Sequence, residues 1–149
     1  MQVKNHMLLV FPSLSQNESF ARQAVAAFAL QVGDWTVQEI DEITTAISEA
    51  VTNAIIHGYD QSVGEVRVRA NILEDRGLEV LVEDDGVGIP DVALAREPMF
   101  TTKPEQERTG MGFSFMESFM DELEVTSAPG KGTIVRMVKW LAGSPGIEV

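Results

Sequence analysis

Residues 84–90 form a short acidic and glycine-rich segment whose residue types suit recognition of a flat polar ligand. Gly86 and Gly88 permit backbone conformations that other residues rarely adopt, and they let the main chain pass close to a ligand. The carboxylate of Asp84 can accept a hydrogen bond from an exocyclic amine, which is how a protein could read adenine. A plain acidic turn is the alternative. An EF-hand calcium loop is excluded because its ligand spacing and terminal glutamate are missing.

Two polar side chains stand four residues apart earlier in the sequence. Glu49 and Asn53 project from the same face of any helix that contains them. Small residues at neighbouring positions leave room for a ligand to approach: Ala46, Ala50 and Ala54. Taken alone, the pair favours a solvated helix face that carries one ordinary hydrogen bond, so a functional interpretation depends on the other motifs.

Cations and glycines follow the acidic segment. Arg96, Lys103 and Arg108 lie between residues 84 and 110, and the glycine pair Gly110 and Gly112 opens the next helix. Backbone N–H groups at a helix start can face phosphate oxygens, and Arg108 or Lys103 could neutralise a terminal phosphate. The alternative is a solvated loop whose cations pair with the glutamates beside them.

Three other candidates carry less chemistry. Residues 130–133 lack the upstream glycine of a P-loop, and no Ser or Thr directly follows Lys131, so we expect a hairpin turn there. His57 has no second ligand at a metal-binding spacing and is interpreted as structural. Ser48 and Ser114 lack the His and Asp partners of a hydrolase triad.

The first thirty residues predict an edge strand and an amphipathic helix. Residues 7–14 predict a short strand that ends at Pro12, and residues 15–18 predict a capping box. The helix continues to Gly33, and its buried face is predicted from helical spacing: Phe20, Ala24, Ala27 and Phe28. Arg22 points away from that face, so we expect it either to contact an acidic partner or to pair with Glu18.

A second capping box at residues 36–39 opens the helix that carries Glu49 and Asn53, and Gly58 ends it. Its predicted apolar stripe is Val37, Ile40, Ile43, Ile47, Val51, Ala54 and Ile55. Residues 65–84 alternate with period two around a turn, which predicts a hairpin, and residues 123–140 predict another.

Between the two hairpins we expect a lid over residues 84–110 and a helix from Met111 to about Glu122. The apolar residues of that helix are Phe115, Met116, Phe119 and Met120. The order of elements predicts an α/β fold: a two-layer sandwich in which helices cover one face of a mostly antiparallel sheet.

Composition limits the class of protein. The chain has 149 residues and no cysteine, so we expect one domain over residues 1–149 and neither disulfides nor a cysteine zinc site. Its formal net charge of −12 argues against nucleic-acid binding. The same charge repels ATP at long range, so the phosphates need Mg²⁺ and local cations. No segment predicts a signal peptide or a membrane span, so we expect a cytoplasmic protein.

The order of these motifs resembles that of the GHKL (histidine-kinase-like) ATPase superfamily. The matching segments span nearly the whole chain: residues 49–54, 84–88, 109–112 and 132–133. Three further segments are similar to the anti-sigma serine kinases of spore-forming bacteria, a branch of that superfamily: residues 19–22, 53–59 and 100–105. The stretch near Trp35 and the tail after Lys139 depart from the family pattern.

The resemblance implies a set of site residues and cofactors. It makes Glu49 the general base, Asn53 the Mg²⁺ ligand, Asp84 the adenine-reading carboxylate and Arg108 the γ-phosphate contact. The ATP-binding residues that it implies are Asn53, Asp84, Gly86, Gly88, Lys103, Arg108, Thr109, Gly110, Met111, Gly112 and Thr133. The cofactors are ATP or ADP and Mg²⁺.

The resemblance also implies an activity and partners. Such a kinase phosphorylates a serine of an anti-anti-sigma protein, sequesters a sporulation sigma factor and forms a homodimer. Two alternatives stay open: a kinase of the general stress branch, and a sigma-binding module that uses ATP only as a conformational ligand. A sensor histidine kinase is disfavoured because there is no room for a dimerising helical hairpin with a phosphoacceptor histidine.

Overall fold

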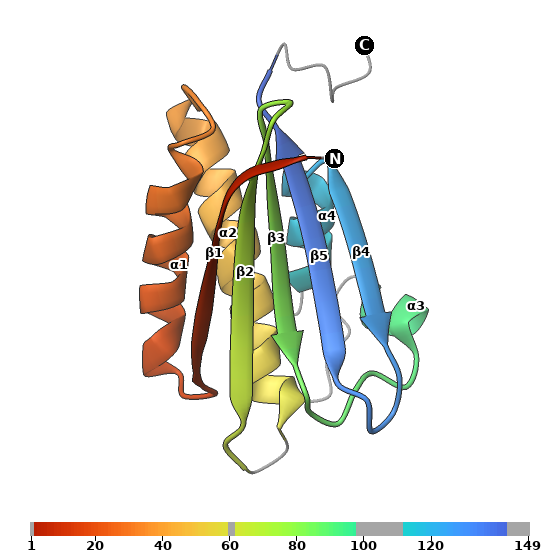
Figure 1. Ribbon diagram of the computed structural model, residues 1–149. Helices are drawn as coiled ribbons and strands as arrows, with labels where there is room; N and C mark the ends of the chain where they lie inside the picture. Colours follow the sequence, from red (N-terminus) through yellow and green to blue (C-terminus); the bar gives the residue numbers. More distant parts are fainter. Residues whose placement is uncertain (1, 60–61, 98–111, 143–149) are drawn as a thin grey trace.

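A five-stranded antiparallel sheet, in the order β1-β2-β3-β5-β4, organises the molecule (Figure 1). The computed structural model describes residues 2–59, 62–97 and 112–142. The strands are β1 (Val3–Pro12), β2 (Glu65–Leu73), β3 (Gly77–Asp84), β4 (Glu122–Ser127) and β5 (Thr133–Trp140). Both predicted hairpins are confirmed, and the first strand is an edge strand that begins four residues earlier than predicted.

Three helices cover one face of the sheet: α1 (Gln16–Ala29), α2 (Val37–Asn53) and α4 (Gly112–Phe119). A π-helical turn, η1 (Ala54–Gly58), continues α2, and a short helix that the sequence did not predict, α3 (Val92–Ala95), follows β3. The two-layer α/β sandwich is therefore confirmed. Among the described residues, no helix is both long enough and apolar enough to cross a membrane.

The core lies between the helices and the sheet. Alternate residues of β2 and β3 point into it and are buried: Val66, Val68, Ala70, Ile72, Leu78, Val80 and Val82. They meet the α2 residues Ile43, Ile47 and Val51, which are completely buried. Burial of this apolar surface supplies the main stabilisation of the fold. The opposite face of the sheet has no helix in the described part of the chain, and it carries charged side chains paired across strands.

The predicted face of α1 was wrong. Phe20 is 60% exposed, and the completely buried residues of the helix are Ala21, Val25 and Ala29. The predicted capping box at Ser15 is also wrong, because Ser15 has helical backbone angles and its side chain makes no cap hydrogen bond. The second capping box is confirmed: the Thr36 side chain accepts from the Glu39 N–H, and Glu39 accepts from the Thr36 N–H.

Candidate functional site

Asp84, the last residue of β3, points to the helix-covered face and is only 6% exposed. Its cross-strand partner on β5 is Thr133. One carboxylate oxygen of Asp84 accepts a hydrogen bond from the Gly86 N–H at 3.0 Å, and the Thr133 N–H also donates to this carboxylate. A buried acceptor is thus held in place by main-chain donors.

Burial raises the pKa of Asp84 above its usual value, because desolvation disfavours the charged form. The negative charge of Asp85 raises it further. The N–H groups of Gly86 and Thr133 and the positive charge of Arg67 act in the opposite direction. The ionised form therefore depends on the donors around it.

Glycines bring three chain segments together around Asp84. A Cβ atom on Gly58 would lie 3.0 Å from the Asp84 Cγ, one on Gly86 would overlap the Gly58 carbonyl, and one on Gly132 would overlap the Asp84 carbonyl. Gly88 has a φ of +77° and packs against the carbonyl of Ala128. These glycines let main chain pack on main chain, so close contact with the protein itself explains their positions.

Ser127 links the loop after β3 to the turn between β4 and β5. Its hydroxyl accepts from the Ile89 N–H at 2.7 Å and donates to the Gly132 carbonyl at 2.8 Å. The Thr133 hydroxyl oxygen lies 2.8 Å from the Ser127 hydroxyl oxygen. Because the single hydroxyl hydrogen of Ser127 is directed at Gly132, Thr133 donates to Ser127 and keeps its own lone pairs free to accept.

Glu49 and Asn53 meet at the start of α4. A Cβ atom on Gly112 would lie 3.2 Å from the Asn53 Nδ2 and 3.2 Å from a Glu49 carboxylate oxygen. The helical spacing therefore does bring the two side chains to one place, and a glycine at position 112 makes room for them. The alanines of the same helix do not line this site: Ala46, Ala50 and Ala54 are buried in the core.

A π-helical turn and one main-chain hydrogen bond connect the pair to the Asp84 loop. The π-helical turn that follows Asn53 ends at Gly58, and the Gly58 carbonyl accepts from the Val87 N–H at 2.7 Å. π-turns of this kind are frequent at functional sites. The end of α2 is therefore attached directly to the acidic, glycine-rich loop.

Several predicted site residues lie outside the described part of the chain: Lys103, Arg108, Thr109, Gly110 and Met111. Residues 98–110 of the predicted lid lie there as well. Arg96, another cation of that stretch, pairs with Glu117 of α4 at 3.3 Å. Arg22 pairs with Glu18 at 3.0 Å, which is the local pairing considered from the sequence.

Sequence reasoning missed three residues that shape the site: Tyr59, Arg67 and Ser127. Tyr59 directly follows the Asn53–Gly58 segment, and Ser127 is the cross-strand partner of Thr133. Their proximity to recognised motifs was a usable signal. No such signal pointed to Arg67, because its side chain lies on the face of the sheet opposite to Asp84.

The protein oxygen atoms at this site fit a magnesium ion that takes most of its ligands from a bound molecule and from water. Among residues 2–59, 62–97 and 112–142, no group of three His, Asp or Glu side chains could hold a metal ion. The amide oxygen of Asn53 is a hard donor, and Gly112 leaves open the space beside it. Mg²⁺ commonly takes one or two protein oxygens and completes its octahedron with phosphates and water.

The fold and these motifs are those of a nucleotide-binding domain of known type. The family model described as a histidine kinase-like ATPase domain matches residues 11–139. Two solved structures share the fold. The RsbU and RsbW domains of Rv1364c from Mycobacterium tuberculosis match 93% of this chain and 33% of theirs, at a TM-score of 0.66 and 20% identity. A blue-light activated histidine kinase of Erythrobacter litoralis matches 80% of this chain and 40% of its own chain, at a TM-score of 0.55 and 25% sequence identity.

Curated relatives define the branch of the family. The anti-sigma F factor of Caldanaerobacter subterraneus subsp. tengcongensis is 56% identical over 141 residues, which is 95% of this chain and 97% of the relative. That of Bacillus licheniformis is 52% identical over 146 residues, 97% of this chain and 99% of the relative. The chain belongs to the anti-sigma F factor family of histidine kinase-like ATPases.

Proposed function

We propose that this protein transfers the γ-phosphoryl group of Mg-ATP to a serine of an anti-anti-sigma protein and sequesters a sporulation sigma factor. One observation carries the proposal: the Glu49 and Asn53 pair at Gly112 is joined by η1 to the loop that holds the buried Asp84. The name of the curated relatives, anti-sigma F factor, supports a sigma factor as partner.

Each side chain has a distinct role in the proposed reaction. The Asp84 carboxylate accepts from the exocyclic amine of adenine, and the lone pairs of Thr133 face the same region. Asn53 holds Mg²⁺, which when bound neutralises charge on the phosphates. Glu49 takes the proton from the serine hydroxyl as that oxygen attacks the γ-phosphorus, and the bond to the β-phosphate oxygen breaks to give ADP.

Charge neutralisation is central because the protein is strongly acidic. Phosphoryl transfer depends mainly on positioning and on stabilising the charge of the transferred group. A chain with a net charge of −12 must supply cations locally. We propose Lys103 and Arg108 for this role, with the main-chain N–H groups of residues 109–112 beside them.

The test is phosphoryl transfer to purified candidate anti-anti-sigma proteins by the parental protein and Glu49→Gln. We expect Glu49→Gln to bind Mg-ATP almost normally and to transfer phosphate about 10²–10⁴ times more slowly, the usual contribution of a general base. Asp41→Asn is the matched control, because Asp41 is an exposed carboxylate on the same helix, and its rate should stay parental.

The outcomes separate the alternatives. Transfer by Glu49→Gln at the parental rate would remove Glu49 as the base. If the parental protein transfers no phosphate but binds a sigma factor only with ATP present, the protein is a binding module that uses ATP as a conformational ligand. Phosphorylation only of a general stress anti-anti-sigma protein would place it in that branch.

A further inference from the structure

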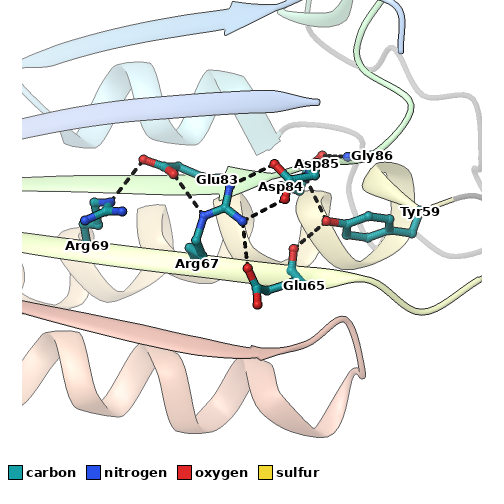
Figure 2. Close-up of polar contacts among 8 residues, drawn as sticks. All are labelled: Tyr59, Glu65, Arg67, Arg69, Glu83, Asp84, Asp85 and Gly86. Carbon is teal, nitrogen blue, oxygen red and sulfur yellow. Dashed lines mark hydrogen bonds and ion pairs between the residues drawn. The ribbon is translucent and has the colours of Figure 1, made fainter. Parts of the chain in front are cut away.

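The side chain of Asp85 points to the opposite face of the sheet from that of its neighbour Asp84. Successive residues of a strand point to opposite faces, so Asp85 projects onto the open face of the sheet, where its side chain is 67% exposed. There it meets Arg67 of β2 (Figure 2). The Nη1 and Nη2 atoms of Arg67 donate to the two carboxylate oxygens of Asp85, each at 2.9 Å. This is the bidentate fork that arginine forms with carboxylates.

Tyr59 holds the main chain of the same residue. Its hydroxyl accepts from the Asp85 N–H at 2.8 Å and donates to the Glu65 carbonyl at 2.5 Å. Burial raises the pKa of Tyr59 above its usual value, so the hydroxyl stays protonated and able to donate. The ring packs over Gly64, where a Cβ atom would overlap it. Tyr59 directly follows η1 and so connects the Asn53 segment to this turn.

The contacts from Arg67 and Tyr59 together fix the side chain and the main chain of Asp85. Arg67 fixes the side chain of Asp85, Tyr59 fixes its N–H, and Asp85 lies between Asp84 and Gly86, whose N–H donates to the Asp84 carboxylate. An exposed ion pair contributes little to stability by itself. Its geometric consequence is larger, because a fixed turn need not lose conformational freedom when a ligand binds.

Arg67 also governs the charge beside Asp84. It faces three carboxylates, those of Asp85, Glu65 and Glu83, at 2.9, 2.9 and 3.2 Å. Its hydrogen bonds, and to a smaller extent its charge, lower the pKa of Asp85, and its charge opposes the rise in the pKa of Asp84. Without Arg67, three carboxylates would face one another near an acceptor that must stay ionised.

We propose that Tyr59 and Arg67 are positioning residues for the nucleotide, acting through Asp85 to hold the turn from which Asp84 reads adenine. We call Tyr59, Arg67 and Asp85 the Asp85 clamp. The proposal rests on the proposed adenine-reading role of Asp84. It assigns nucleotide preference partly to residues on the face of the sheet opposite to Asp84.

The test measures the dissociation constants of Mg-ADP and Mg-GDP for the full chain and for Arg67→Met and Tyr59→Phe. We expect each variant to bind Mg-ADP about three- to tenfold more weakly, the scale of losing pre-organisation of one or two side chains. Binding of Mg-GDP, which has no exocyclic amine at the same position, should change less, so the preference for adenine falls. Arg69→Met is the matched control: Arg69 lies on the same strand and face, and it pairs with Glu83 at 3.4 Å.

Two further variants make the result decisive. The double variant Arg67→Met/Asp85→Asn should lose no more affinity for Mg-ADP than the weaker-binding of the two single variants. Both substitutions break the same contact, the one between Arg67 and Asp85. Parental affinity and preference in Arg67→Met and Tyr59→Phe would overturn the clamp. An equal loss in Arg69→Met, or an equal loss for both nucleotides, would also overturn it, since that indicates general damage. Asp84→Asn separates the two proposals: if it keeps parental affinity and preference, the adenine-reading role itself fails.

Discussion

Two adjacent aspartates at the end of β3 have opposite electrostatic surroundings. Asp84 is buried and its pKa is raised, whereas Arg67 holds the pKa of the exposed Asp85 below its usual value. The contrast arises because the two neighbouring side chains point to opposite faces of the sheet, where Asp84 is buried and Asp85 pairs with Arg67. In our proposals one carboxylate binds the nucleotide, and the other holds the turn.

The raised pKa of Asp84 predicts how nucleotide binding depends on pH. In the proposed site the amine of adenine donates to the ionised carboxylate, so protonation of Asp84 would remove the acceptor. We expect Mg-ADP affinity to fall as pH is lowered through the raised pKa, at a pH where an ordinary aspartate is still ionised. Calorimetric titrations from pH 7 downward check this, with uptake or release of protons followed in two buffers.

Asp84→Asn is the control for that titration. It should bind Mg-ATP about 1.5–3 kcal/mol more weakly at neutral pH, the value of a hydrogen bond to a charged group. The remaining affinity should lack the pH step. A carboxylate whose folded pKa is raised costs stability at every pH above the raised value and less as pH falls toward the unfolded pKa. The variant should therefore unfold at higher urea than the parent at pH 7, and an unchanged pH step in it would assign the titration to another group.

At the scale of elements, the strands and the first helix were predictable, but the buried face of that helix was not. Val66, Val68 and Ala70 alternate with polar residues, so a period of two leaves only one face for the core. In α1, apolar residues stand on every side, including five alanines, so several stripes fit the sequence. In the structure the stripe of smaller residues is buried, which lets α1 pack closely on its neighbours, and Phe20 is exposed to solvent.

The candidate site was predictable where its residues are close in sequence. Helical spacing placed Glu49 beside Asn53, and the strand end placed Asp84 before its glycines. Contacts across the sheet were not predictable in this way. The pairing of Arg67 with Asp85 requires the register of β2 against β3, and the link from Ser127 to Ile89 requires the fold of the loop.

Lys139 of β5 gives a prediction about α4. It is only 8% exposed, its Nζ donates to the Phe119 carbonyl at the end of α4 at 2.6 Å, and it lies 3.8 Å from Glu42. Lys139→Met should lower the free energy of unfolding by about 1–3 kcal/mol, because the partly buried Phe119 carbonyl loses its charged donor and Glu42 loses a nearby cation. Urea denaturation measures this. Lys131→Met, in the exposed hairpin turn, should change stability by less than about 0.5 kcal/mol.

On the scale of the whole molecule, the layers separate two kinds of surface. The open face of the sheet carries cross-strand ion pairs such as Arg136 with Glu79 at 2.7 Å, so its cations are already neutralised. The helix α1 also leaves large side chains exposed: Phe20 is 60% exposed, and Leu30, at its C-terminal end, is 62% exposed. Arg22 lies on another side of the helix and is half-exposed. Aromatic residues and arginine are both enriched in protein interfaces.

Partner binding at α1 is therefore the prediction for the molecule as a whole. Arg22→Ala and Phe20→Ala should each weaken binding of the sigma factor, the anti-anti-sigma protein or both by at least about 1 kcal/mol, the cost expected of an interface anchor. The pair with Glu18 is a partly exposed i,i+4 pair worth only a few tenths of a kcal/mol, so Arg22 can exchange it for an acidic partner group. Affinity for Mg-ATP should stay parental, and so should partner binding by Lys131→Ala, which removes a cation from an exposed turn. If calorimetric titration gives parental affinity of both α1 variants for both partners, α1 is not the docking surface, and the nucleotide site assignments are unaffected.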